Sequence, residues 1–388
     1  MKLLVAIISL QCWFHVVIAR IYYVQPSNEV KGKRFGTFLN PFDSIQECVD
    51  TLKNEGDECQ IRAGKYHENI LVTGLNGKPE KPFVIRGYGD ERPILDGTID
   101  VQPLTKWKNN LHKNIYSAKI PTAIWQLFID GEMMTNARWP NAKWSDKTIF
   151  NGTLWSGLSK SSKRGLIVNK GDGLKKTNID MTGAMAILNI GSFNTFVAKV
   201  KHHKANTNTF TFDDTFGDYH FKPERSRYFL EDKLELLDTA EEWFYDKNTS
   251  ILYVWTPTGE SPAGFKLRGK TQSYAMQIRN SSHLLIQNID FFATTLNADS
   301  VNATFRVHNI TFHSLNFKYH SYSKRMLGDS SLIQWTEVNG IYDKRRQNTW
   351  GRFTFFNNTF YGSDGLALSY HGSNVTLENN LSQRLDCS

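Results

Sequence analysis

The sequence contains few residues that fix a fold through covalent or turn chemistry, with 4 cysteines and 11 prolines among 388 residues. It also lacks a second long apolar run, because no segment after Met1–Ala19 is long enough to cross a bilayer. That first segment has the charged start, apolar stretch and small-residue end of a signal peptide, and cleavage before Arg20 is expected. Gln11 and His15 interrupt the apolar stretch and disfavour an uncleaved anchor. We therefore predict a secreted mature chain without membrane attachment.

Cysteine usage agrees with an oxidising compartment. Cys12 is removed with the signal peptide, and ten residues separate Cys48 from Cys59. A disulfide between these two is expected, and closing so short a loop is worth roughly 2–3 kcal/mol. Cys387 is left over, and it pairs either with a cysteine beyond Ser388 or with another chain.

Several chemistries lack their motifs. The sequence contains no Ser/His/Asp nucleophile elbow, no phosphate-binding loop and no zinc-ligand spacing, so we expect no cofactor and no metal. The formal net charge is +8, but the basic residues are scattered and no nucleic-acid motif accompanies them. Aromatic residues make up 13% of the chain. They favour sugar stacking and stacking inside a core about equally.

A repeat is present between His283 and Ser388. Four short apolar, β-branched or aromatic runs end on an asparagine, with steps of 21, 48 and 22 residues between the asparagines. The step of 48 divides into two if Leu332–Trp335 is an intermediate copy without the asparagine. A period of 21 to 24 carried by strands indicates a β-solenoid. The four asparagines are Asn288, Asn309, Asn357 and Asn379.

Asparagine suits a sharp corner between two strands, because it tolerates the left-handed backbone conformation. In stacked coils, equivalent residues lie about 4.8 Å apart, and their amides can then hydrogen-bond along the stack. A meander of antiparallel hairpins is the alternative, and the absence of Asn-Gly turns from these copies disfavours it.

The repeat resembles the right-handed parallel β-helix of the pectate-lyase-like superfamily. We therefore predict an all-β fold, a right-handed parallel β-helix (β-solenoid) with a short N-terminal capping helix and a β-rich insertion. Ser44 and Glu47 predict the start of the helix through a capping box. The expected parts are a signal peptide at 1–19, a cap and first coils at 20–103, an insertion at 104–269 and further coils at 270–388.

Two strings in the insertion strengthen this resemblance. Ala137-Arg138-Trp139-Pro140-Asn141 and Glu241-Glu242-Trp243-Phe244-Tyr245-Asp246 are similar to "A-R-[WY]-P-N" and "G-E-W-[FY]-x-D" strings of secreted β-helix glycoside hydrolases, including β-xylosidase and α-galactosidase types. In the second string, Glu241 replaces the glycine. The strings are not catalytic, so the resemblance implies architecture more than activity. The polygalacturonase motif set is missing, apart from Asp213-Asp214 within the insertion.

Eight Asn-x-Ser/Thr sequons are present, and a secreted protein can carry glycans on them. We expect modification at Asn151, Asn248 and Asn302. Asn309 and Asn357 are expected to stay unmodified, because the ladder would occupy their amides.

The candidate active site lies on the C-terminal coils. Sugar hydrolysis requires two carboxylates across the scissile bond, whereas a lyase requires a base and a cation. Asp364 stands in the glycine-flanked turn Gly362–Gly365 before a strand, where a side chain can project into a groove. The candidate catalytic residues are Asp364, Asp329, Glu337 and His371, and the candidate substrate-binding residues are Tyr370 and Trp335. His67 and Glu68 are interpreted as a structural turn at the capped end.

The leading hypothesis is a secreted, monomeric glycoside hydrolase-like protein that acts on a polysaccharide. A polysaccharide lyase and a non-catalytic glycan-binding or extracellular matrix module are the alternatives. Asn379-Asn380-Leu381 opens a further coil shortly before Ser388, and no terminal cap follows. The chain is therefore interpreted either as a truncated product or as a divergent member without activity.

Overall fold

The computed structural model describes residues 19–26, 32–109, 114–191, 195–300, 306–321, 336–339, 341–343, 348–363, 367–372 and 374–385. Strands dominate these residues, and their helices are short, so the prediction of an all-β fold is confirmed. None of the described helices is long and apolar enough to cross a membrane. The helices are α1 (Ile45–Thr51), α2 (Gly173–Lys176) and the 3-10 turns η1 (Thr148–Phe150), η2 (Gly152–Leu154), η3 (Pro223–Arg225), η4 (Leu234–Leu236) and η5 (Pro262–Gly264).

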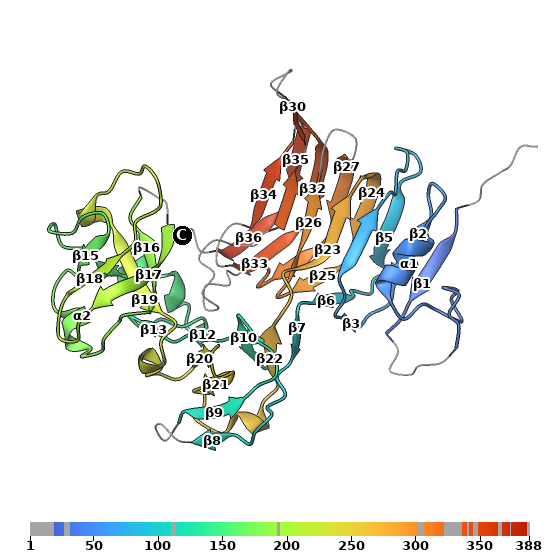
Figure 1. Ribbon diagram of the computed structural model, residues 1–388. Helices are drawn as coiled ribbons and strands as arrows, with labels where there is room; N and C mark the ends of the chain where they lie inside the picture. Colours follow the sequence, from blue (N-terminus) through green and yellow to red (C-terminus); the bar gives the residue numbers. More distant parts are fainter. Residues whose placement is uncertain are drawn as a thin grey trace, which may run out of the picture.

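Three parallel sheets form the larger part of the fold (Figure 1). The first sheet contains β1 (Ile21–Val24), β2 (Glu58–Ile61), β5 (Phe83–Gly87), β24 (Ser281–Gln287), β27 (Val307–His313), β32 (Arg352–Phe356) and β35 (Asn374–Glu378). The second contains β3 (Lys65–Tyr66), β6 (Ile94–Asp96), β25 (Asp290–Phe292), β28 (Asn316–Lys318), β33 (Thr359–Ser363) and β36 (Leu381–Leu385). The third contains β4 (Ile70–Thr73), β23 (Tyr274–Arg279), β26 (Thr295–Asp299), β29 (Thr336–Asn339) and β34 (Leu368–His371).

Successive passes of the chain contribute one strand to each sheet in turn, as β24, β25 and β26 do. The inward side chains of the three sheets share one apolar core. Inside it, Phe291, Phe317 and Phe360 stack with ring centroids 4.6 and 4.8 Å apart and nearly parallel planes. Phe312 and Phe355 form a similar pair at 4.7 Å. These phenylalanines therefore pack inside the core and are not exposed for stacking against a ligand.

The corner between the first and second sheets corrects the predicted asparagine column. Asn288, Asn357 and Asn379 adopt the left-handed conformation there, with φ near +54°, as predicted. The fourth member of the column is Ser314, with φ +52°, because Gln287 pairs with His313 and His313 pairs with Phe356. Asn309 also has a positive φ, but it lies within β27 beside His283. Its assignment to the corner was wrong, because the residues on both sides of it, His308 and Ile310, pair with Ser282 and Leu284 of β24. Asn309 therefore lies within the strand and not after its end.

The amides that hydrogen-bond along the stack come from the residue after the corner. Asn358 is buried, and its Nδ2 donates to Asn380 Oδ1 at 2.9 Å and to the carbonyl of Phe312 at 3.0 Å. Asn380 Nδ2 donates in turn to the carbonyl of Phe355 at 2.8 Å. Asn357 itself is exposed, which removes the reason to expect it unmodified. An amide contact thus joins the last two of these passes, one position after the predicted column. The equivalent positions in the two earlier passes are the buried Ile289 and Leu315, so the predicted ladder through all four copies was wrong.

The long step of 48 residues is a single pass. β27 pairs directly with β32, so no intermediate coil separates them in the first sheet. The additional residues include β29 and an antiparallel hairpin of β30 (Ile341–Asp343) and β31 (Asn348–Trp350). The prediction of a hidden copy at Leu332–Trp335 was therefore wrong, and residues 332–335 lie outside the described part of the chain.

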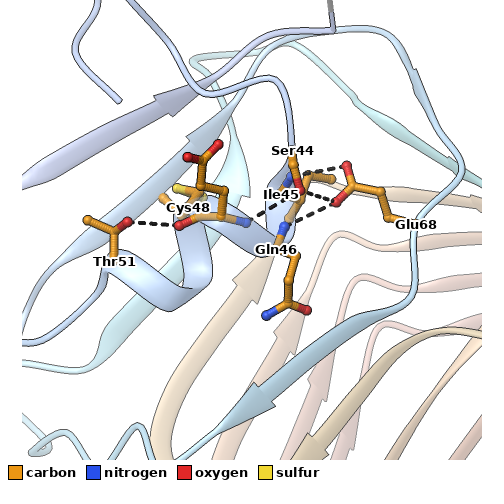
Figure 2. Close-up of a disulfide and its surroundings, with 8 residues drawn as sticks. Ser44, Ile45, Gln46, Cys48, Thr51 and Glu68 are labelled. Atoms are coloured by element: carbon orange, nitrogen blue, oxygen red, sulfur yellow. Dashed lines mark hydrogen bonds between the residues drawn. A yellow bond between two sulfur atoms is a disulfide. The ribbon is translucent and has the colours of Figure 1, made fainter. Parts of the chain in front are cut away.

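The helix α1 packs against the first pass, as the sequence predicted, and Ile45, Cys48 and Val49 form its buried face. Cys48 and Cys59 form the expected disulfide, which joins the helix to β2 across 6.1 Å between Cα atoms. Ser44 caps the helix and accepts a hydrogen bond from the Glu47 amide. Figure 2 shows that the carboxylate beside these groups belongs to Glu68, so the predicted reciprocal role of Glu47 falls to a residue far along the chain.

Glu68 is a helix-capping residue, in agreement with its interpretation as structural. Its carboxylate accepts hydrogen bonds from Ser44 Oγ, the Ile45 amide and the Gln46 amide at 2.8, 3.0 and 3.1 Å. Since the first amides of a helix have no partners within the helix, an anion there is stabilising. Nδ1 of the neighbouring His67 lies 2.7 Å from the carbonyl of Asp96, which likewise indicates a structural contact.

We expect Glu68→Ala to lower the free energy of unfolding by about 1.5–3 kcal/mol, the range for hydrogen bonds to a charged group. The loss is measured as a lower urea midpoint. Glu80→Ala, at an exposed position nearby, is the matched control and should leave the midpoint within error. Equal midpoints for the two variants would show that the carboxylate does not hold the helix.

The chain leaves the parallel sheets after β6 and returns at β23, and the intervening residues build further, largely antiparallel sheets (Figure 1). One contains β11 (Glu132–Met133), β10 (Leu127–Ile129), β22 (Leu267–Lys270) and β7 (Thr98–Asp100). Another contains β12 (Thr135–Asn136), β20 (Glu242–Asp246), β21 (Ile251–Val254), β9 (Tyr116–Lys119) and β8 (Lys108–Asn109). The third contains β13 (Arg138–Trp139), β19 (Arg227–Glu231), β16 (Met185–Asn189), β17 (Thr195–His203), β18 (Thr209–Phe212) and β15 (Leu166–Val168), with β14 (Ser156–Gly157) on β19.

The sheet that contains β10 and β11 packs against the second parallel sheet through aromatic side chains. Phe128 lies 4.9 Å from Phe292 and 5.4 Å from Tyr319 between ring centroids. Tyr319 donates a hydrogen bond to Glu132 Oε2 at 2.8 Å. Burial and then this carboxylate raise the pKa of Tyr319, so the phenol stays protonated. The contact fixes the insertion against the parallel sheets.

The two strings that carried the resemblance meet in space. β12 pairs in parallel with β20, and the buried Glu242 carboxylate accepts hydrogen bonds from the amides of Arg138 and Asp238 at 3.3 and 3.2 Å. Tight packing of these segments therefore explains why the strings occur together. Between these two segments in the sequence, Leu234–Leu236 form a 3-10 turn.

Glu242 predicts a pH dependence of stability. Burial, and secondarily the charge of Asp238, raises the pKa of Glu242 from its ordinary value of 4.5 to about 8. The folded protein then binds a proton that the unfolded chain releases, so stability is lost as the pH rises from the unfolded value to about 8. We expect the urea midpoint to fall between pH 5 and pH 8 and Glu242→Gln to reduce that fall. An unchanged fall in the variant would assign the slope to other groups.

Candidate functional site

Most of the predicted site falls on residues that the structure does not describe. Asp329, Asp364 and Trp335 lie outside the described residues, as do Asn302 and Cys387. Of the other expected glycan sites, Asn248 is exposed in the turn between β20 and β21. Asn151 is exposed as well, and its Oδ1 accepts a hydrogen bond from the Thr153 amide at 3.0 Å.

The structure brings Glu337 and His371 onto neighbouring strands of the third parallel sheet. Glu337 pairs with Asn297 of β26 on one side and with Ser369 of β34 on the other. His371 pairs with Asn339, which in turn pairs with Asp299. The two predicted residues therefore occupy two adjacent columns of one sheet, although 34 positions separate them in the sequence.

The register also places Tyr370. It pairs with Val338, which pairs with the fully buried Ala298, so Tyr370 stands in an inward column of the sheet. Tyr370 is nevertheless 47% exposed, because β34 is the last described strand of this sheet. A sugar-stacking role for Tyr370 remains a prediction.

The outer face of the third sheet is polar next to Glu337 and His371. On β26, Asn297 and Asp299 alternate with the buried Leu296 and Ala298 and are only partly buried. On β23, Gln277 pairs with Asn297 and accepts a hydrogen bond from Arg279 Nη2 at 2.9 Å. One column thus contains Gln277, Asn297, Glu337 and Ser369, and the next contains Asp299, Asn339 and His371.

Asp299 is a candidate that sequence analysis missed. It lies in the middle of the repeat region, at the end of β26 and just before the undescribed residues 301–305. The alternation Leu296-Asn297-Ala298-Asp299 was a usable signal, because it presents two polar residues on the outer face of a strand. The glycine-flanked turn around Asp364 is the stronger local pattern in the sequence, which is why Asp299 was not predicted.

Asp299 and Glu337 occupy diagonal positions on neighbouring strands. With strands about 4.8 Å apart and a rise of about 3.3 Å per residue, diagonal Cα atoms two residues apart are separated by about 8 Å. Glycosidases place their two carboxyl groups about 5–5.5 Å or 6.5–9.5 Å apart. The register thus places the Cα atoms of these two acidic residues about 8 Å apart on neighbouring strands, with His371 in the same column as Asp299.

Among the described residues, no group of three or more His, Cys, Asp or Glu side chains is arranged to hold a metal ion.

No protein-family model and no curated protein matches the chain. Among solved structures, the fold is similar to a chain described as a glycoside hydrolase, with 12% identity, a TM-score of 0.54, and coverage of 95% of this chain and 96% of that one. The complex of XylC with xylose has 9% identity and a TM-score of 0.33 over 94% of this chain and 70% of that one. The Gp54 tailspike of Acinetobacter baumannii bacteriophage AP22, in complex with a capsular saccharide, has 7% identity and a TM-score of 0.17 over 84% and 64%. At 12% identity, the first likeness concerns the fold alone.

Proposed function

We propose that the chain is a secreted, monomeric, carbohydrate-active protein of the glycoside hydrolase type that acts on a polysaccharide. Its parallel sheets would form a right-handed parallel β-helix, capped by α1 and interrupted by an insertion over about residues 104–269. The alternating order of the three sheets and their common core support this description. The fold likeness to a solved glycoside hydrolase adds support at the level of architecture.

One observation carries the enzymatic part of the proposal. The register sets Glu337 diagonally to Asp299 on one face of the third sheet. Hydrolysis of a glycosidic bond requires one carboxylic acid to protonate the leaving oxygen and one carboxylate to activate water or to attack the sugar. In the proposed mechanism, Glu337 and Asp299 supply these two groups. Asn297 and Gln277, in the Glu337 column, would bind sugar hydroxyls through their amides.

The other predicted residues keep their proposed roles near this face. Asp364 and Asp329 remain proposed carboxylates of the same site, and Tyr370 and Trp335 remain proposed sugar-binding residues. In the sequence, Asp364 follows β33 and precedes β34, seven positions before His371.

A polysaccharide lyase is the second candidate, and the second column favours it. His371 stands in that column, and Arg279 ends β23, the strand beside β26 in the same sheet. Lyase chemistry requires a base and a cation for the substrate carboxylate. The formal charge of +8 also suits an acidic polymer.

A glycan panel tests the proposal. The purified protein is incubated with neutral polysaccharides, uronate polymers and short oligosaccharides. New reducing ends, ultraviolet absorbance of the products and binding of each glycan are then measured. New reducing ends without ultraviolet-absorbing products are the expected result for a hydrolase. Unsaturated, ultraviolet-absorbing products would replace the hydrolase with the lyase, and binding without product would leave the non-catalytic module.

A further inference from the structure

A separate cavity of about 590 Å³ lies between the second parallel sheet and the insertion. Its volume falls within the range of about 300–1,000 Å³ that small-molecule sites occupy. β6, β25 and β28 form its floor, where Asp290 and Asn316 pair across neighbouring strands. The Asp130–Gly131 turn, Lys266 just before β22 and Arg268 of β22 form the opposite wall. The cavity is therefore on a different sheet from the proposed catalytic face.

The floor presents an acceptor in a fixed orientation. Asp290 Oδ1 accepts hydrogen bonds from Arg92 Nε and Nη2 at 2.8 and 2.6 Å and from Asn316 Nδ2 at 2.9 Å. Its other oxygen, Oδ2, accepts none from the described residues. A carboxylate held on one oxygen and available on the other is suited to a ligand hydroxyl, because a hydrogen bond to a charged acceptor is strong.

The opposite wall supplies a second acceptor and a donor. Asp130 Oδ1 accepts a hydrogen bond from the Lys266 amide at 3.1 Å, which orients the carboxylate at the edge of the cavity. The Lys266 ammonium lies at the same edge and forms no ion pair with any described residue. Donors and acceptors therefore face one another across the cavity, as they do around a molecule with several hydroxyl groups.

The charges of the lining nearly cancel. Four cationic side chains and three carboxylates line the cavity. Arg268 already forms two ion pairs, because its Nη2 lies 3.2 Å from the carboxylate of the buried Asp96 and its Nη1 lies 2.6 Å from the carboxylate of Asp100. Lys318 likewise pairs with Glu132 at 3.0 Å. With Arg92, Asp100 and Glu132, which form ion pairs with lining residues, the groups around the cavity number five cations and five carboxylates. This balance favours a neutral ligand, because an acidic or a basic one would add an uncompensated charge to the cavity.

Apolar side chains lie beside these polar groups on the floor of the cavity. Phe292 and Ile94 line the floor and are partly exposed, and Phe128 supports the Phe292 ring at 4.9 Å. Aromatic and aliphatic surface between hydroxyl-binding groups matches the C–H face and the hydroxyl edge of a sugar ring. We propose that this cavity binds a short stretch of neutral glycan, as a second site that holds the polymer whose hydrolysis is proposed above.

Binding to a catalytically silenced chain tests this assignment without loss of ligand to turnover. In Glu337→Gln, isothermal titration with neutral xylo-, gluco- and galacto-tetrasaccharides should reveal two binding events for the tetrasaccharide that binds. Adding Asp130→Asn and Asp290→Asn should raise the dissociation constant of one binding event by about tenfold or more, since each substitution removes a charged hydrogen-bond acceptor. The control adds Asp90→Asn and Asp218→Asn instead, both at exposed positions, and should keep both events. Equal urea midpoints of the two chains establish that both are folded.

The cavity site would be overturned if the cavity substitutions left tetrasaccharide binding unchanged, or if no tetrasaccharide bound at all. It would also be overturned if the protein bound only acidic oligogalacturonides and Lys266→Met abolished that binding. The proposed function is judged separately by turnover in the unsubstituted chain. Turnover with no effect of the cavity substitutions on binding would remove the second site only. Absent turnover with a cavity-dependent binding event would remove the hydrolase assignment only.

Discussion

Glu337→Gln is expected to lower the turnover of a cleaved glycan by at least about 100-fold, the lower end of what a positioned acid or base contributes. The amide cannot supply or accept the proton that glycoside cleavage transfers, while its size is nearly that of the carboxyl group. Asp299→Asn is expected to produce a loss of similar order, because hydrolysis requires both groups. The measurement is the initial rate of reducing-end formation at saturating substrate.

The matched control is Glu378→Gln, on the exposed end of β35 in the first sheet. It is the same chemical change on a different face and should leave the rate within about twofold of the unsubstituted protein. If Glu337→Gln and Glu378→Gln have equal rates, Glu337 has no part in the chemistry. A loss confined to Asp364→Asn would move the reaction to the turn that follows β33.

Phe317→Ala is expected to lower the free energy of unfolding by about 3–5 kcal/mol, the typical cost of removing a buried phenylalanine side chain. Phe317 is 1% exposed and lies between Phe291 and Phe360 in the stack of aromatic rings. Its removal leaves a cavity shared by three passes of the chain, which the neighbouring strands cannot fill without losing their register. The change is measured as a lower urea midpoint followed by tryptophan fluorescence.

Phe35→Ala serves as the control, because Phe35 is 58% exposed. Its effect should stay within about 0.5 kcal/mol, as for most surface substitutions. A Phe317→Ala protein that unfolds at the same urea concentration as Phe35→Ala would contradict a continuous core shared by the parallel sheets.

The fold was predictable where local chemistry and global packing agree. Ser44, the apolar spacing after it and the pair Cys48 and Cys59 predicted the helix and the disulfide that the structure contains. Short apolar runs predicted strands such as β5 and β24, because alternation of buried and exposed residues is a property of the run itself.

Register was less predictable, because it depends on residues far apart in the sequence. Asn309 follows an apolar run just as Asn288 does, yet Ser314 occupies the corner in that pass. Serine accepts the left-handed conformation at a cost that the surrounding ladder offsets, so no asparagine marks this corner. The capping carboxylate was hidden for the same reason, since Glu68 reaches Ser44 only after the chain has turned back.

The candidate site was predictable only in part. Glu337 and His371 were named from the sequence, and the register sets them on neighbouring strands. Asp299 joined them only once β26 was paired with β29, because the alternation in its run indicates a polar outer face but not which strand lies beside it. The cavity beside Asp290 depends on contacts between the second sheet and an insertion more than a hundred residues long, which no local pattern encodes.

The most direct test of the account is a crystal structure of Glu337→Gln with a bound oligosaccharide of the cleaved glycan. The account predicts sugar density across β26, β29 and β34, with a glycosidic oxygen between residues 299 and 337. Density confined to other surfaces, with the outer face of the third sheet covered only by solvent, would contradict it.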